Sequence, residues 1–386
     1  MKTLVACTAE IDDIEVAVKE ILDQLDVENS LCKNTVGIMT CHYEFVDSGA
    51  AKAISEALPF DVIGVVSLTE AINTETGTLL LTLMVLTDDQ DIFVPKLTSS
   101  LLENPGKAIR EAYVAAAAEQ DDKPALVLTF APFIMQNNGD DYADTITEAS
   151  GGIPCFGTVA VDGTNDFSNS YMLYNGEAYL DRMGMIVLYT QRVPKFFLAT
   201  ISPEKIYDKP AVVTKSQGHI LMEVNGRPLI HYFEELGLAD ASQEQYAMAS
   251  VPFMMDYGDG TPPVSKVFIA YTPEQYGVCA AVMPEGATLN VGELDKEDVL
   301  FTSAQAVDHA MEDISKGAGV LIFSCLARNM SLGVDVLAEA NLIREKLKDK
   351  VPFMMACSGG EFCPTQVSNT KAINRFHNNT FVACIL

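Results

Sequence analysis

Residues 318–364 read AGVLIFSCLARNMSLGVDVLAEANLIREKLKDKVPFMMACSGGEFCP, and the fold class follows from this stretch. It opens with six apolar or small residues, Val320 to Cys325, which have the length and composition of a buried strand. A polar loop carrying Arg328 and Asn329 is expected next. Apolar residues then recur at a 4-3-4 spacing that predicts one face of a helix: Val336, Ala340, Ile343 and Leu347.

The ends of this predicted helix have suitable residues. Ser331 is the expected cap at its start, and three lysines within 346–350 match the negative end of a helix dipole. A second apolar strand, at 352–356, leads into Ser358-Gly359-Gly360-Glu361. Both strands therefore finish in small, polar or charged residues, at the edge where α/β proteins usually bind ligands.

The same strand–helix–strand unit occurs twice more in the chain. The first copy has strands at 36–40 and 61–66 around a helix at 49–58, and the second has strands at 125–130 and 153–159 around a helix at 142–149. A helical segment precedes each copy, at 13–25, 105–120 and 303–316. Each copy ends near an acidic residue: Glu70, Asp162 or Glu361. The repetition indicates a duplicated packing unit.

The chain of 386 residues is too long for one small core, which favours two domains. Pro194 precedes a new series of strands, so we predict domains at 1–194 and 195–386. The fold class predicted is α/β: two strand-rich domains whose mixed sheets are flanked by helices and built from the repeated strand–helix–strand unit.

Composition excludes several classes of protein. The net charge of −28 argues against nucleic-acid binding, because phosphates require a basic surface. An anionic membrane would repel a protein of this charge. The longest uncharged run contains prolines and asparagines and does not predict a membrane-spanning helix. The nine cysteines are odd in number and lack paired spacing, which is typical of a reducing compartment. We therefore expect a cytoplasmic protein.

Several segments together resemble the FIST family of intracellular sensory modules. In the first half they are VGIMTCHYEF, VIGVVSLTEA and PCFGTVAVDGTNDFSNSYMLYNGE, and in the second VTKSQGHILMEVNGRPLIHYFEELG, GVLIFSCLARNMSLG, GGEFCP and HNNTFVACIL. Two departures are Asn225, where the family often has an acidic residue, and the poorly matching region 239–263. The resemblance covers nearly the whole chain through the order and spacing of these pieces.

The resemblance implies a sensory module for a small molecule such as an amino acid. Some family members bind haem and respond to diatomic gases such as nitric oxide, which gives an alternative function. No kinase, cyclase or methyl-acceptor segment is seen, so the output is expected to need a separate signalling protein. No cofactor is expected, except haem if the alternative function applies. The sequence is compatible with a homo-oligomer.

The residues themselves suggest where a ligand would bind. Arg328 and Glu361 are expected at neighbouring strand ends. Their guanidinium and carboxylate would suit the two charges of an amino acid, and Arg328 alone could bind a small carboxylate. The alternatives are an ion pair for Arg328 with a nearby acid, a turn-stabilising role for Glu361, and turn chemistry for Asp162. The predicted ligand-binding residues are Cys325, Arg328, Asn329, Ser358, Gly360, Glu361 and Asp162.

A second alternative, from another class, is an enzyme that acts on a small metabolite through Cys325 or Glu361. No nucleophile-elbow or phosphate-loop motif supports it, and no catalytic residue is predicted. Cys357 and Cys363 have the wrong spacing for a zinc ribbon, so no metal site is predicted.

Overall fold

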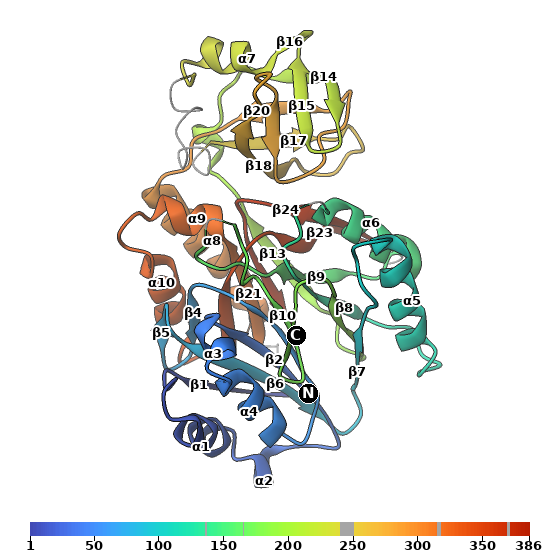
Figure 1. Ribbon diagram of the computed structural model, residues 1–386, viewed down its shortest axis with the longest axis vertical. Helices are drawn as coiled ribbons and strands as arrows, with labels where there is room; N and C mark the ends of the chain where they lie inside the picture. Colours follow the sequence, from blue (N-terminus) through green and yellow to red (C-terminus); the bar gives the residue numbers. More distant parts are fainter. Residues whose placement is uncertain (136, 165, 240–250, 315–317, 369–370) are drawn as a thin grey trace.

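The computed structural model describes residues 1–386 except 136, 165, 240–250, 315–317 and 369–370 (Figure 1). Its described residues form three six-stranded sheets and one seven-stranded sheet. The three six-stranded sheets make up the large body of the molecule and are called the large sheets, and the seven-stranded sheet forms the small separate lobe at the top of Figure 1.

Each large sheet belongs to one structural unit. Unit 1 contains β1 (Lys2–Thr8), α1 (Ile14–Leu25), α2 (Val27–Ser30), β2 (Asn34–Cys41), α3 (Glu44–Asp47), α4 (Ala50–Ala57), β3 (Val62–Val66) and β6 (Leu81–Asp88). Unit 2 contains β7 (Ile92–Leu97), α5 (Pro105–Ala117), β8 (Leu126–Ala131), α6 (Gly139–Ser150), β9 (Cys155–Val159) and β12 (Gly184–Tyr189). Unit 3 contains β13 (Lys195–Ala199), α8 (Lys296–Ile314), β21 (Val320–Cys325), α9 (Leu326–Ser331), α10 (Ala338–Leu347), β22 (Phe353–Ser358) and β25 (Phe381–Ile385).

The units also exchange hairpins. The exchanged pairs are β4 (Glu70–Ile72) with β5 (Thr76–Gly77), β10 (Met172–Tyr174) with β11 (Glu177–Tyr179), and β23 (Glu361–Val367) with β24 (Ala372–His377). The hairpin that follows β3 joins the sheet of unit 3, the one after β9 joins unit 1, and the one after β22 joins unit 2. The resulting strand orders are equivalent: β1-β6-β2-β3-β10-β11, β7-β12-β8-β9-β23-β24 and β13-β25-β21-β22-β4-β5.

The repeated unit predicted from the sequence is therefore confirmed, and so is the mixed α/β class. The central strand pairs β2–β3, β8–β9 and β21–β22 are parallel, whereas their outer neighbours run antiparallel. The predicted division at 194/195 lies between β12 and β13 and stays a prediction. The hairpin exchange crosses it, because β4 from the first half pairs with β22 from the second.

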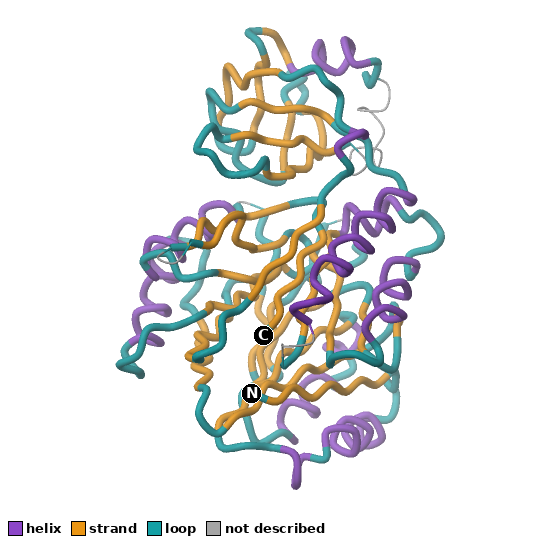
Figure 2. Tube along the Cα trace, turned by 180° about the vertical axis from the view of Figure 1, so that it is seen from behind, coloured by secondary structure: helices purple, strands orange, loops and turns teal. Residues whose placement is uncertain are grey.

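One face of every large sheet packs into a common core. Phe130 and Phe156 of unit 2 meet Phe323 of unit 3 there, with ring centroids 6.5 and 5.6 Å from that of Phe323. The opposite faces are covered by helices: α1 and α4 on unit 1, α5 and α6 on unit 2, α8 and α10 on unit 3. Figure 2 shows these helices outside the strands. Because both faces are buried, strands such as β8 are apolar almost throughout rather than alternating.

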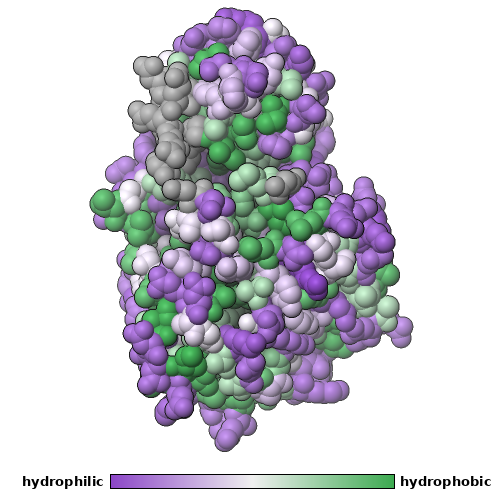
Figure 3. Space-filling view, viewed as in Figure 1, coloured by the Kyte–Doolittle hydropathy of each residue, from purple (hydrophilic) through white to green (hydrophobic). Residues whose placement is uncertain are grey.

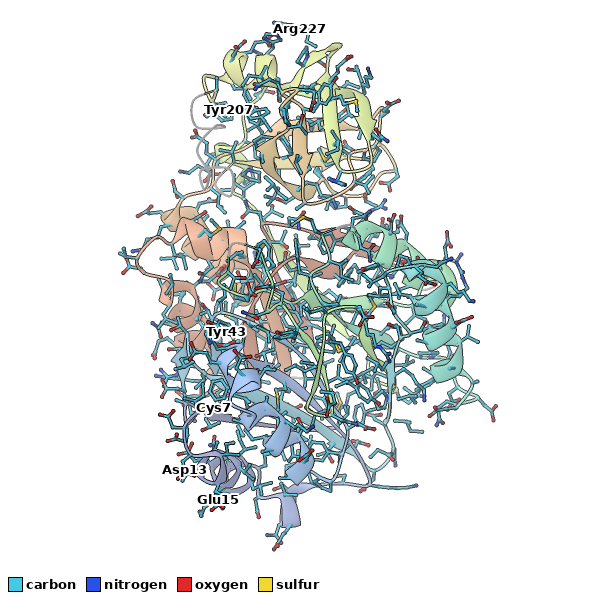
Figure 4. All side chains as sticks on the ribbon, viewed as in Figure 1. Cys7, Asp13, Glu15, Tyr43, Tyr207 and Arg227 are labelled. Atoms are coloured by element: carbon cyan, nitrogen blue, oxygen red, sulfur yellow. The ribbon has the colours of Figure 1, made fainter. Side chains whose placement is uncertain are left out.

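The seven-stranded sheet is an insertion between β13 and α8, which we call the inserted barrel. It follows η1 (Pro203–Lys205) and consists of β14 (Ala211–Gln217), β15 (Ile220–Val224), β16 (Arg227–Pro228), α7 (Leu229–Leu236), β17 (Pro252–Asp256), β18 (Val264–Tyr271), β19 (Gly277–Cys279) and β20 (Thr288–Val291). β14 pairs with both β15 and β20, which closes the ring of strands around a core of its own. Figure 4 places Tyr207 and Arg227 on this lobe, with Arg227 at the end far from the body.

The helices of unit 3 differ from the prediction. Arg328 and Asn329 lie in the short helix α9 rather than in a loop. Ser331 ends α9 and donates a hydrogen bond to the Ala327 carbonyl, so it does not cap α10, which starts at Ala338. Helix α8 begins at Lys296, inside an acidic stretch expected to be a loop, and the last two residues of the predicted helix lie outside the described residues.

The surface agrees with the composition. Hydrophilic residues cover most of the face in Figure 3, with scattered apolar residues between them. No helix in the described part of the chain is long and apolar enough to cross a bilayer.

Candidate functional site

The ends of the central strands of all three units meet at one place, which we call the junction: residues 66–70, 159–162 and 357–361. The Val161 amide donates to the Val66 carbonyl at 3.1 Å, and the Cys357 amide donates to the Thr69 carbonyl at 2.9 Å. The Gly359 amide donates to the Val159 carbonyl at 2.8 Å. Each pair of units is thus joined by a backbone hydrogen bond at the point where acidic residues follow the strands.

Two of those acidic residues, Glu70 and Glu361, are fully buried at the junction. Both oxygens of Glu70 and the Oε1 atom of Glu361 have no hydrogen-bond partner among the described residues. The Oε2 atom of Glu361 accepts a 2.5 Å hydrogen bond from the Thr380 hydroxyl. Buried polar atoms are rarely left without partners, because the lost hydration is not replaced.

Both carboxyl groups lie near Cys357. Burial raises the pKa of the Cys357 thiol well above its usual range, and the nearby Cys325, Glu70 and Glu361 raise it further. Burial also raises the pKa of Glu361 to about 8, against the opposing effect of hydrogen bonds such as that from Thr380. The pKa of Glu70 is raised well above its usual range for the same reason, with the Ser67 hydroxyl opposing the shift. Burial therefore favours the neutral form of both carboxyl groups.

Arg328 lies close enough to Glu361 for its charge to oppose the rise in the pKa of that carboxyl group, but its guanidinium points to the side of β21 that faces α8. It is fully buried and pairs with Glu339 of α10, with its Nη2 atom 3.1 Å from Oε1. The remaining guanidinium hydrogen bonds go to the Thr200 and Val299 carbonyls and the Thr302 and Ser303 hydroxyls. Glu339 also accepts hydrogen bonds from Ser303 and Ser324. The ion pair weighed as the alternative for Arg328 is thus present, and a ligand would have to displace Glu339 to reach the guanidinium.

Three other predicted residues have protein partners. The Asp162 carboxylate accepts hydrogen bonds from the Thr164 amide and hydroxyl and from the Asn169 amide, which is the turn chemistry weighed against a ligand role. The side-chain amide of Asn329 donates a hydrogen bond to the Val336 carbonyl at 2.8 Å. The Ser358 hydroxyl accepts from Thr158 and donates to the Gly360 carbonyl.

At Gly359 and Gly360 other parts of the protein pack closely against the backbone, in the space that a side chain would fill. A Cβ atom on Gly360 would lie 2.2 Å from the Phe376 ring, and one on Gly359 would lie 2.8 Å from the Ala160 carbonyl oxygen. Gly360 also has a φ of +149°. Glycine is required here because packing and backbone conformation both exclude a side chain.

Cys325 lies at the junction and has an apolar neighbour, Val267 of the inserted barrel. Burial raises the pKa of its thiol strongly, which favours an unreactive group over a nucleophile. His377 is buried opposite Glu361 in the β23–β24 register, and its Nε2 atom is 3.1 Å from the Cys363 carbonyl oxygen, to which it donates. Burial, with the charges of Lys266 and Arg375, lowers the pKa of His377 to about 3, so the imidazole is neutral.

The inserted barrel covers the junction through β18. The Ser265 carbonyl accepts from the Asn378 amide at 3.0 Å. The Lys266 ammonium, fully buried, donates to Asp140 at 2.8 Å and to the Phe376 carbonyl at 2.6 Å. Figure 1 shows β18 at the base of the lobe, next to β24. The segment 376–380 therefore runs from the barrel contact to Thr380, which holds Glu361.

Sequence reasoning identified Glu361 and missed three residues of this site. Glu70 has a detectable signal, because it holds the same place in unit 1 as Glu361 does in unit 3. Lys266 is a cation inside the otherwise apolar run VSKVFIAY, which is a sign of a buried charge pair. Thr380 has no local signal, since only the tertiary fold brings it to Glu361.

The family comparisons agree with this architecture. The FIST N domain matches residues 35–227, and the FIST C domain matches residues 229–364. The chain belongs to the FIST family. FIST domains are sensory domains of signal transduction, so the chain is a sensory module.

Among solved structures, the chain is similar to two cyanuric acid hydrolases. The protein from A. caulinodans is 10% identical, covers 100% of this chain and 98% of its own, and has a TM-score of 0.41. A second cyanuric acid hydrolase is 8% identical with the same coverage and a TM-score of 0.36. These scores carry no argument about function. No curated protein matches the chain.

Proposed function

We propose that this FIST protein is a cytoplasmic sensor of a small amino-bearing molecule, an amino acid in the first instance, which binds at the junction through its ammonium group. The observation that carries the proposal is the pair of buried carboxyl groups of Glu70 and Glu361, three of whose four oxygens lack a partner in the described structure. A buried acid without a partner is a costly arrangement that a ligand cation would relieve.

The polar atoms around the pair support a ligand that donates hydrogen bonds. His377 Nδ1 and Asn378 Oδ1 are buried without partners next to Glu361. Nδ1 is an acceptor in the tautomer whose Nε2 donates to Cys363. The nearby cations Arg328 and Lys266 are held by Glu339 and Asp140. The ammonium end of an amino acid therefore suits the junction better than a carboxylate alone.

The inserted barrel gives the sensor a means of response. The carboxyl groups of Glu70 and Glu361 are fully buried, and β18 contacts segment 376–380, so in this proposal a ligand enters when the barrel shifts away from that segment. A ligand that pulls on Glu361 acts on Thr380 and, through that segment, on the contacts of Ser265 and Lys266. In this proposal the position of the barrel is what a separate signalling partner recognises.

Thermal shift measurements across the standard amino acids test the proposal, with each amino acid compared with its N-acetyl form and its carboxamide. The active ligand should stabilise the protein, its carboxamide should still do so, and the N-acetyl form should not, because acetylation removes the ammonium charge. Glu70→Gln and Glu361→Gln should abolish the shift while both variants remain folded. Absence of a shift with every amino acid, or equal shifts with the N-acetyl forms, would refute the ammonium site.

A further inference from the structure

A separate cavity of about 360 Å³ opens on the surface of unit 3, beside the connection to the inserted barrel. The end of β13 and residues 200–204 form one wall, and α8 forms the other. Its volume is at the lower end of the range found for small-molecule sites. It shares no residue with the junction.

The lining combines an apolar surface with a few polar groups, as ligand pockets do. Phe301 of α8 is 51% exposed at the cavity, and Leu198 of β13 is 37% exposed. Large apolar side chains are not usually left in water at a concave site without a use. Together they offer a surface on which a flat ring can lie.

Ser202 fixes one wall of the cavity to the other. It lines the cavity and is 3% exposed, and its backbone amide donates to the carboxylate of Asp298 in α8 at 3.2 Å. Its Oγ atom is itself buried, without a hydrogen-bond partner among the described residues, so the hydroxyl does not face the open cavity. The wall that carries Glu204 is therefore held against α8.

The charges at the cavity favour a cation. Glu204 and His309 are among the lining residues, whereas none of the lining residues is Lys or Arg. Arg328 lies behind the wall, but its guanidinium is used by Thr200, Thr302 and the Glu339 cluster. The whole chain carries a net charge of −28, which attracts cations further.

We propose that this cavity is a second small-molecule site, for an aromatic amine whose ring packs on Phe301 and Leu198 and whose ammonium group lies toward Glu204. The aromatic face of Phe301 adds a cation–π attraction for a charged amine. The position beside residues 200–204 places the ligand against the chain segment that leads into the inserted barrel.

Calorimetry with the full chain and phenethylamine tests this site, with 2-phenylethanol as the uncharged probe of the same shape. We expect phenethylamine to bind more tightly than 2-phenylethanol. Phe301→Ser should weaken phenethylamine binding about tenfold, and Glu204→Gln should remove most of the preference for the amine. Both residues are exposed, so these variants should fold, and Leu102→Ser, at a 63% exposed apolar residue of another unit, is the matched control.

The outcomes separate this site from the junction. Binding that survives Glu70→Gln and Glu361→Gln but is lost in Phe301→Ser supports the cavity. No binding at millimolar concentration, or binding that Phe301→Ser and Glu204→Gln leave unchanged, overturns the proposal. Binding lost only in the junction variants overturns it as well, because the amine would then occupy the other site.

Discussion

Two buried clusters of charged residues in this protein have opposite character. Around Arg328 and Glu339, the guanidinium and the carboxylate each find partners on α8, α10 and β21. Around Glu70 and Glu361, two buried carboxyl groups lie near one thiol, and three of their four oxygens have no hydrogen-bond partner among the described residues. The first cluster is complete within the described structure, and the second is not.

This difference separates a structural role from a functional one. A completed ion pair holds helices against a sheet, and removing one partner leaves a buried charge that destabilises the fold. Buried carboxyl groups without partners cost stability, so neutral substitutes of the same shape should be tolerated. Arginine near a strand end is therefore a poor guide to a ligand site unless its partners are known.

The largest effect is expected from breaking the completed cluster. Glu339→Ala leaves the Arg328 guanidinium buried without its carboxylate and should lower the free energy of unfolding by about 3–5 kcal/mol. Urea denaturation measures the loss. A loss below about 1 kcal/mol would show that the two clusters do not differ in the way described.

Glu361→Gln should change how stability depends on pH. The pKa of Glu361 is about 8 in the folded protein, against 4.5 for the free side chain, so the folded state binds the proton more tightly. The contribution of the Glu361 carboxyl group to the free energy of unfolding is favourable below about pH 4.5 and is lost as the pH rises toward 8. The variant should show a smaller fall in unfolding free energy across this window, by about 2–4 kcal/mol.

Denaturation series at several pH values check this prediction, with Glu15→Gln on the surface of α1 as the control. Figure 4 places Glu15 at the end of the molecule opposite the barrel. Identical pH profiles for Glu361→Gln and the unaltered protein would contradict the burial of an unpaired acid.

Lys266→Met tests the contact between the barrel and the body. Burial disfavours the Lys266 charge, but Asp140 and Tyr257 outweigh burial and raise the pKa of this lysine, so the contact depends on an ion pair. We expect a loss of about 1–3 kcal/mol and faster amide hydrogen exchange at Asn378, whose amide donates to Ser265. Unchanged exchange at that amide would show that the barrel is held by other contacts.

The smallest effect is expected at an exposed pair. Lys19 and Asp23 form an i,i+4 ion pair on α1 with more than half of each side chain exposed. Lys19→Ala should leave the free energy of unfolding almost unchanged, because solvent screens an exposed ion pair. Thermal denaturation checks this, and a loss as large as that of Glu339→Ala would remove the distinction between exposed and buried pairs.

The sequence was sufficient for the repeated unit and for the strands within it. β21 was predicted at its observed bounds, because a run of six apolar or small residues has the length and composition of a buried strand. The strand predicted at 61–66 is likewise observed, as β3 at Val62–Val66. Local pattern and tertiary structure agree at these places.

The sequence was insufficient where partners come from distant parts of the chain. The exchange of hairpins between units depends on long-range strand pairing, such as β4 with β22, which local periodicity does not encode. For the same reason Arg328 was paired in prediction with Glu361, at the neighbouring strand end. Its partner is Glu339 on the next helix, which the helix pattern assigned to no role.

The most direct test of the junction is the number of protons released when a ligand binds there. Calorimetry at pH 7 in two buffers with different heats of ionisation gives that number, using the amino acid that produces the largest thermal shift. Glu361 is mostly protonated at this pH, so pairing with an ammonium group should release roughly half a proton or more, and Glu361→Gln should release less. Tight binding with no proton release, in the unaltered protein and the variant alike, would contradict the account.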